Sequence, residues 1–274
     1  MDRLIALPSY DVVAYLMVGL VALAACDLIY GTRVVIRHDW NVGVGTLTVI
    51  AAYVVGHMIS SFSGTVFEQR IVVNVMERPV VHLLPPPPRP KEQALQKSQS
   101  QSDKKSQSEL ACIPILTCNY FNPESHLHPK IVAKKPPPDL KEFSDVDYRT
   151  KWKIHVTEVY WEAYNTAKLD KEAYGRIVTF LQLYSFCRNL SFAAFLAAIA
   201  LSIQMLRRCW SRAPAPRILD YGFPRWLSSP AWQLVAFVVV GLVFFNRFLY
   251  MYRAHAIEVL TSYAYAGSVV VLEF

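Results

Sequence analysis

Residues 231–252 read AWQLVAFVVVGLVFFNRFLYMY, and this stretch decides the class of fold. It contains one charged side chain, Arg247, among its 22 residues. The hydrocarbon core of a bilayer is about 30 Å thick and needs roughly 20 apolar residues in a helix to cross it. The stretch therefore predicts a transmembrane helix.

Three more segments have the same character. They are residues 12–30, residues 42–62 and a segment within 177–206 that is most apolar at FAAFLAAIALSIQML. The alternative is a water-soluble protein that buries these helices in its core. Buried helices are seldom so long or so poor in charge, so the pattern favours a membrane protein.

The composition agrees with this reading. Apolar residues make up 53% of the 274 residues and charged residues 18%, whereas soluble domains contain about 25% charged residues. Residues 63–178 hold 17 of the 28 Lys and Arg and 14 of the 21 Asp and Glu. The rest of the chain therefore carries few charged side chains. So little charge in so much of the sequence excludes a fully water-soluble, wholly disordered or collagen-like chain.

We therefore predict an all-α integral membrane protein, a four-helix transmembrane bundle of two hairpins (2+2) with a long, partly disordered insert. The predicted segments are a first transmembrane hairpin (1–62), an extramembrane insert (63–138), an amphipathic interfacial helix (139–178), a second transmembrane hairpin (179–252) and an apolar C-terminal tail (253–274).

The insert changes character along its length. Residues 84–108 combine a proline run with a Ser/Gln/Lys-rich stretch, which predicts a flexible tether. Residues 110–127 form a short apolar island that packs on neighbouring helices or forms a small hairpin. Beyond Pro138, apolar residues recur at helical spacing at Trp152, Val156, Val159, Ala163 and Ala167. Residues 139–206 are therefore expected to form one long helix or a kinked pair.

Both ends of the chain leave alternatives open. Leu23-Ala24-Ala25-Cys26 resembles a lipoprotein lipobox, but the charges before it sum to −1 where a positive charge is typical. Residues 256–274 suit an interfacial or re-entrant helix, or a short strand at SVVVLEF, better than a fifth span.

Arginine placement predicts the orientation. The loop at 207–230 carries five arginines against one aspartate, and the loop at 31–41 carries Arg33 and Arg37. Positive loops face the cytoplasm, so both short loops are predicted to be cytoplasmic in a multi-pass protein of the cell or inner membrane. The insert and both termini would then face outward.

Polar side chains within apolar helices are costly and mark candidate sites. The predicted topology brings several of them to the face of the insert, with Glu258 or Asp11 as the balancing anion. This candidate intramembrane polar layer comprises His57, Arg188, Asn189, Asn246, Arg247 and Glu258. Long arginines near helix ends can instead extend to the headgroups. Asp27 lies toward the opposite face, with Arg33, Arg37, Arg207 or Arg208 as its expected partners.

No catalytic motif is present in the sequence: GxSxG, HExxH, GxxxxGK[ST] and GxGxxG are all missing. We therefore expect a membrane component without catalytic activity that acts by assembly, as an oligomer, a pore-type effector or an accessory subunit. The alternatives are a transporter subunit and a membrane-embedded enzyme that acts on a lipid or phosphate substrate through His57 and Arg188 or Arg247.

We predict no cofactor and no metal. Cys112 and Cys118, with His126 and His128 downstream, do not have a familiar zinc spacing. Unpaired thiols are the leading expectation, and a disulfide or a zinc site is the alternative. The net charge of +7 is explained by loop orientation and anionic headgroups, so no nucleic acid is expected. The expected partners are the bilayer and a second copy or another membrane protein.

Overall fold

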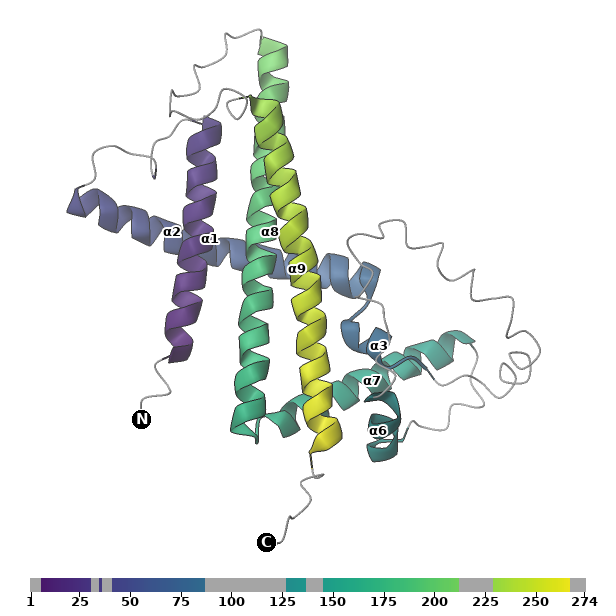
Figure 1. The fold of residues 1–274 in the computed structure, drawn as a ribbon. Coiled ribbons are helices and arrows are strands. Elements are labelled where there is room, and N and C mark those ends of the chain that lie inside the picture. Colours follow the sequence, from purple (N-terminus) through teal and green to yellow (C-terminus); the bar gives the residue numbers. More distant parts are fainter. Residues whose placement is uncertain are drawn as a thin grey trace. The chain divides into compact units, whose positions relative to one another are not determined.

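The computed structural model describes residues 6–30, 35, 41–86, 127–136, 145–211 and 229–266. Every regular element in these ranges is a helix, which confirms the all-α prediction (Figure 1). The elements are α1 (Ala6–Tyr30), α2 (Val42–Ser63), the π-helix η1 (Gly64–Met76), α3 (Pro79–Leu83), α6 (Leu127–Lys134), α7 (Asp145–Ala167), α8 (Lys171–Ser211) and α9 (Pro230–Tyr265).

Four helical stretches are long and apolar enough to cross a membrane. They are Val12–Tyr30, Val42–Leu83, Lys171–Arg207 and Pro230–Tyr265. Each contains one of the four apolar segments predicted from the sequence. Their length and composition are compatible with a multi-pass membrane protein.

The chain folds as two compact units. Unit 1 comprises residues 1–75 and 182–248, and unit 2 comprises residues 76–181 and 249–274. These units group the chain by its packing, whereas the five predicted segments group it by position relative to a membrane. The segment boundaries thus stay predictions.

In unit 1, α1 packs beside α8 and α9. One apolar cluster joins Val18 to Leu190 and Ala193, and a second joins Ile29 to Leu201. Residue numbers on α1 and α8 rise together along this contact, so the two helices run in the same direction (Figure 1). Phe244 joins the first cluster and Phe237 the second, so α9 runs the opposite way.

The packing of α2 differs from the predicted hairpin. The sequence predicted a second helix running back beside the first, but α2 lies across α1 at a steep angle (Figure 1). The crossing is close because it is built on glycine. A Cβ on Gly19 would lie 1.7 Å from Ala52 O, and a Cβ on Gly56 would lie 1.9 Å from Tyr15 O. Backbones touch here as they do in small-residue contacts between membrane helices.

The helix does not stop at the predicted boundary after residue 62. The N–H of Gly64 still bonds to the carbonyls of Ser60 and Ser61, and the chain continues as a π-helix to Met76. The stop comes where Glu77 has a positive φ of 64° and Arg78 precedes Pro79. A residue before proline avoids the helical region, which explains the extended ψ of 144° at Arg78.

Unit 2 is a helical domain around α7. Its core contains Trp152, Val156, Val159, Ala163 and Ala167, all of them buried. The helical face predicted from their spacing is therefore confirmed, and it packs against other helices of this unit. Beside it lie residues of α3, α6 and the C-terminal part of α9, namely Val80, Leu83, Leu127, Ile131, Val259 and Leu260.

The structure decides between the alternatives left open for residues 139–206 and for part of the C-terminal tail. The predicted 139–206 helix is a pair, because α7 ends at Ala167 and α8 begins at Lys171. Asp170 caps the new helix, since its Oδ1 accepts from the N–H of Glu172 and Ala173. The tail is helical to Tyr265, while residues 267–274, with the proposed strand, lie outside the described residues.

Candidate functional site

A buried ion pair joins η1 to α8 in unit 1. Arg188 NH1 donates to Glu68 Oε2 over 2.6 Å. The Arg188 side chain is 9% exposed and that of Glu68 is 30% exposed. An arginine withdrawn from water is tolerated when a carboxylate faces it, because the unpaired charge would cost several kcal/mol.

A second polar contact lies next to this pair. Ser63 Oγ donates to Asn189 Oδ1 over 2.5 Å, and both residues are buried. The same Asn189 oxygen lies 3.4 Å from Arg188 Nε and 3.4 Å from Arg188 NH2. We call Ser63, Glu68, Arg188 and Asn189 the polar cluster, because these four side chains form one connected network.

The π-helix places Glu68 in this cluster. Wider turns shift which side chains share a face, and π-helical turns occur often at functional sites. Gly64 leaves room for the guanidinium, since a Cβ there would lie 3.6 Å from Arg188 NH1. The ring of Phe67, the residue directly before Glu68, meets the rings of Phe192, Phe195 and Phe245 at centroid distances of 5.3 to 6.0 Å. Aromatic packing therefore fixes the helix that carries Glu68.

The structure places the six predicted site residues in different surroundings. Arg188 and Asn189 belong to the polar cluster, where they contact Glu68 and Ser63. His57 is exposed and packs on the rings of Tyr15 and Tyr53, at centroid distances of 5.4 and 6.5 Å. On α9, Asn246 is half-buried and Arg247 is exposed.

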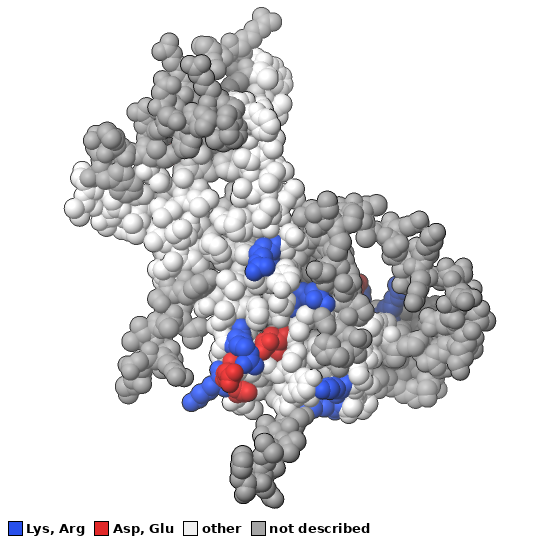
Figure 2. Space-filling view, viewed as in Figure 1, with Lys and Arg blue, Asp and Glu red and all other residues white. Residues whose placement is uncertain are grey.

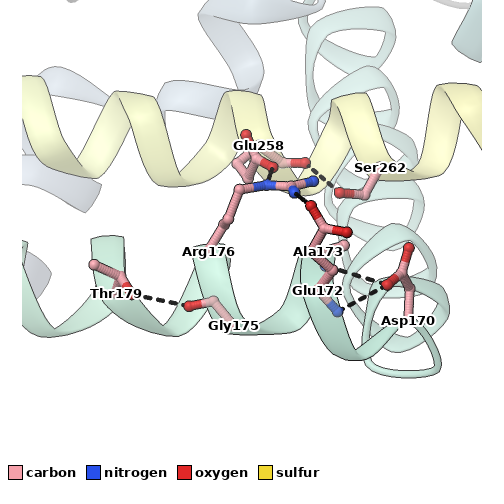
Figure 3. Close-up of polar contacts among 8 residues, drawn as sticks. All are labelled: Asp170, Glu172, Ala173, Gly175, Arg176, Thr179, Glu258 and Ser262. Atoms are coloured by element: carbon pink, nitrogen blue, oxygen red, sulfur yellow. Dashed lines mark hydrogen bonds and ion pairs between the residues drawn. The ribbon is translucent and has the colours of Figure 1, made fainter.

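Glu258 belongs to unit 2 and pairs with Arg176. Arg176 Nε donates to Glu258 Oε1 over 2.6 Å, and its NH1 donates to Glu172 Oε1 over 2.8 Å (Figure 3). The anion in contact with Arg188 is therefore Glu68, where the sequence suggested Glu258 or Asp11. The side chain of Asp11 lies outside the described residues.

Sequence reasoning missed Glu68 and Ser63. Both were assigned to the insert, because the apolar run ends at Phe62 and Glu68 is followed by Gln69 and Arg70. The available signal was the absence of proline until Pro79, which permits the helix to continue.

Asp27 is buried on α1 with a backbone partner. Its Oδ2 accepts a hydrogen bond from the N–H of Val35 over 2.6 Å. Of the four arginines expected beside it, Arg207 is exposed, and Arg33 and Arg37 lie outside the described residues. The side chain of Arg208 is also outside the described part.

A polar network in unit 2 closes the end of α9. Lys134 Nζ donates to the carbonyls of Tyr263 and Ala266, and a lysine there satisfies open carbonyls at the helix end. Glu162 accepts from Lys135 Nζ and from Tyr263 Oη, both over 2.7 Å. The hydrogen bonds from Lys135 and Tyr263 hold the pKa of Glu162 below its ordinary value.

Charged side chains are unevenly distributed between the units. On the face of Figure 2, the helices of unit 1 are mostly uncharged, and red and blue side chains gather near the ends of α8 and α9 that belong to unit 2. Apolar side chains are strongly exposed on α2, among them Val42, Leu47 and Phe62. Such a surface suits lipid or another apolar helix better than water.

The described residues include only some of the candidate metal ligands and thiols. No group of three His, Cys, Asp or Glu within the described ranges is placed to hold a metal ion. Cys26, Cys187 and Cys209 are free thiols. Cys112, Cys118 and His126 lie outside the described residues, so the choice between free thiols, disulfide and zinc stays a prediction.

The polar cluster links α2, η1 and α8 through a hydrogen bond and an ion pair. Glu68 is engaged by Arg188, and the Ser63 hydroxyl faces two acceptors, Asn189 Oδ1 and Ser60 O. A serine nucleophile needs a base that removes its proton, and a side-chain amide and a peptide carbonyl are not bases.

Comparison with protein-family models, with curated proteins and with solved structures found no match.

Proposed function

We propose that this chain is a multi-pass membrane protein without catalytic activity, which acts by assembly as an oligomer or as an accessory subunit of a membrane complex. The observation that carries the proposal is the Arg188–Glu68 pair. A buried arginine of an apolar helix joins that helix to a second one, with Asn189 and Ser63 beside it.

The surface of unit 1 supports the same proposal. Large apolar side chains are exposed along α2 and α9, including Ile50, Met58, Val239 and Val243. In a bilayer these side chains face lipid or the helix of a neighbour. Unit 2 has a helical core of its own. Most of this unit is residues 76–181, which lie largely between the second and third apolar segments.

Native mass spectrometry of the tagged full-length chain in nanodiscs prepared directly from its membrane tests this proposal. We expect a discrete complex heavier than the 31.1 kDa chain. A mass of one chain, with lipid alone, would contradict assembly. Release of a fluorescent dye from vesicles containing the purified protein separates a pore-type oligomer from a closed one.

One variant distinguishes this proposal from the enzyme alternative. His57→Ala removes the imidazole that an enzyme of this kind would use, while Tyr15 and Tyr53 keep their contact with each other. We expect the complex to keep its mass in this variant. Loss of a turnover-dependent activity from an intact complex would favour catalysis instead.

A further inference from the structure

A pocket of about 380 Å³ opens on the surface of unit 2, between α3 and α7. Side chains with distinct chemistry line it: the cations Arg149 and Lys153, the carboxylate of Glu77, the imidazole of His82 and the apolar walls of Trp152 and Pro85. Its volume falls within the range of about 300–1,000 Å³ that small-molecule sites occupy. The polar cluster of unit 1 has no part in it.

The two cations of the pocket differ in their partners. Arg149 and Lys153 are four residues apart on α7 and so share one face of the helix. Lys153 Nζ is paired with Glu77 Oε1. Arg149 is exposed and has no ion pair with a residue in the described part of the chain. One guanidinium in the pocket is therefore available to an anion.

The walls of the pocket are fixed by hydrogen bonds. Trp152 Nε1 donates to the carbonyl of Leu84 over 2.9 Å, which holds the indole in place. His82 Nε2 donates to the carbonyl of Met76 over 2.7 Å, because a carbonyl oxygen can only accept. Glu77 has a φ of 64°, a conformation that costs free energy in a residue other than glycine and is frequent at ligand sites.

We propose that this pocket binds a phosphate ester. A guanidinium matches phosphate oxygens with two parallel hydrogen bonds, and Lys153 adds a second positive charge once a ligand competes with Glu77. Trp152 and Pro85 offer an apolar wall to the organic part of the ester. The phosphate is carried by a lipid headgroup or by a water-soluble molecule, and the same groups recognise both. The proposal does not depend on assembly in the membrane.

Calorimetric titration of the full-length chain, held in nanodiscs of phosphatidylcholine alone, tests the proposal. The probes are glycerol 3-phosphate, dioctanoyl phosphatidate and, as a comparison without a phosphate monoester, dioctanoyl phosphatidylcholine. We expect saturable binding of at least one of the first two. Tighter binding of the phosphatidate identifies a lipid source, and equal binding of both identifies the phosphate group alone as the determinant.

Three substitutions locate the binding. Arg149→Ala should weaken the affinity by about tenfold, the usual effect of losing a hydrogen bond to a charged group. Lys151→Ala is the matched control, because it removes the same charge from another face of the same helix. Glu77→Gln should strengthen binding, since it removes a carboxylate that repels the phosphate and occupies Lys153. Arg149→Lys, which keeps the charge, should give an intermediate loss.

Two results would overturn the proposal. One is the failure of both phosphate probes to saturate the wild-type protein. The other is an equal loss of affinity in Arg149→Ala and Lys151→Ala, which would mean general attraction of anions by a positive helix. A far-ultraviolet circular dichroism spectrum unchanged from that of the wild type shows that each variant is folded.

Discussion

Arg176 and Glu258 connect the beginning of α8 to the C-terminal part of α9, 82 residues away along the chain. The Nε–Oε1 distance of 2.6 Å equals the NH1–Oε2 distance between Arg188 and Glu68. The two pairs differ in their surroundings, because the Arg176 side chain is 51% exposed and the Arg188 side chain 9%. We therefore expect the two ion pairs to contribute unequally to stability, although their distances are the same.

The exposed pair should contribute little and depend on salt. Glu258→Gln removes the carboxylate while Glu172 still faces Arg176. We expect a small decrease in Tm at low ionic strength that disappears in about 1 M salt, where charges are screened beyond about 3 Å. Thermal unfolding of the purified protein at two salt concentrations checks this. A large decrease that persists in high salt would contradict it.

The buried pair should matter more. Arg188→Gln leaves Glu68 without its partner at a partly buried site, and such a loss costs about 3 kcal/mol. Arg70→Gln, on the exposed side of the same π-helix, is the control and should change stability by less than about 0.5 kcal/mol. Chemical unfolding in nanodiscs measures both variants.

The double substitution provides a sharper test of the same pair. Arg188→Met with Glu68→Leu removes both charges and should be more stable than Arg188→Gln, since no unpaired charge remains. A double variant less stable than Arg188→Gln would show that the pair contributes beyond charge compensation.

Local patterns predicted the helices of this protein but not their pairing. Runs of apolar residues identified the four long helices, and a three-and-four spacing identified the buried face of α7, from Trp152 to Ala167. Both are properties of neighbouring residues, and such properties are visible in a single sequence.

The contacts between helices were harder to predict from the sequence. Glu68 meets Arg188 across 120 residues, and the π-helix changes the period by which Glu68 would be placed on a face. Arg176 meets Glu258 across 82 residues, and nothing near Arg176 in the sequence signals this partner. The crossing of α2 over α1 depends on Gly19 and Gly56 meeting a partner backbone, and one glycine in a helix does not identify its partner.

That crossing gives a third prediction. Gly19→Ala places a methyl group against the carbonyl of Ala52, at backbone atoms that have no side-chain freedom. We expect a loss of about 1–3 kcal/mol, the usual cost of overpacking. Gly175→Ala on α8 is the control, because a Cβ there meets nothing within 4 Å and alanine favours a helix by about 0.5–1 kcal/mol. Chemical unfolding of the two variants should give changes of opposite sign, and equal changes would contradict the close crossing.

A fourth prediction concerns pH. His155 lies in unit 2 on α7, where burial and then the charge of Lys135 lower its pKa below the ordinary 6.5, opposed by Glu158. The unfolded chain therefore takes up the proton first, so this contribution to stability is complete above pH 6.5 and declines as the pH falls from 6.5 toward the folded pKa. His155→Gln cannot titrate and should flatten that part of the stability profile. Thermal unfolding between pH 7.5 and pH 5 measures the slope, and identical slopes in the two proteins would show that His155 is not the titrating group.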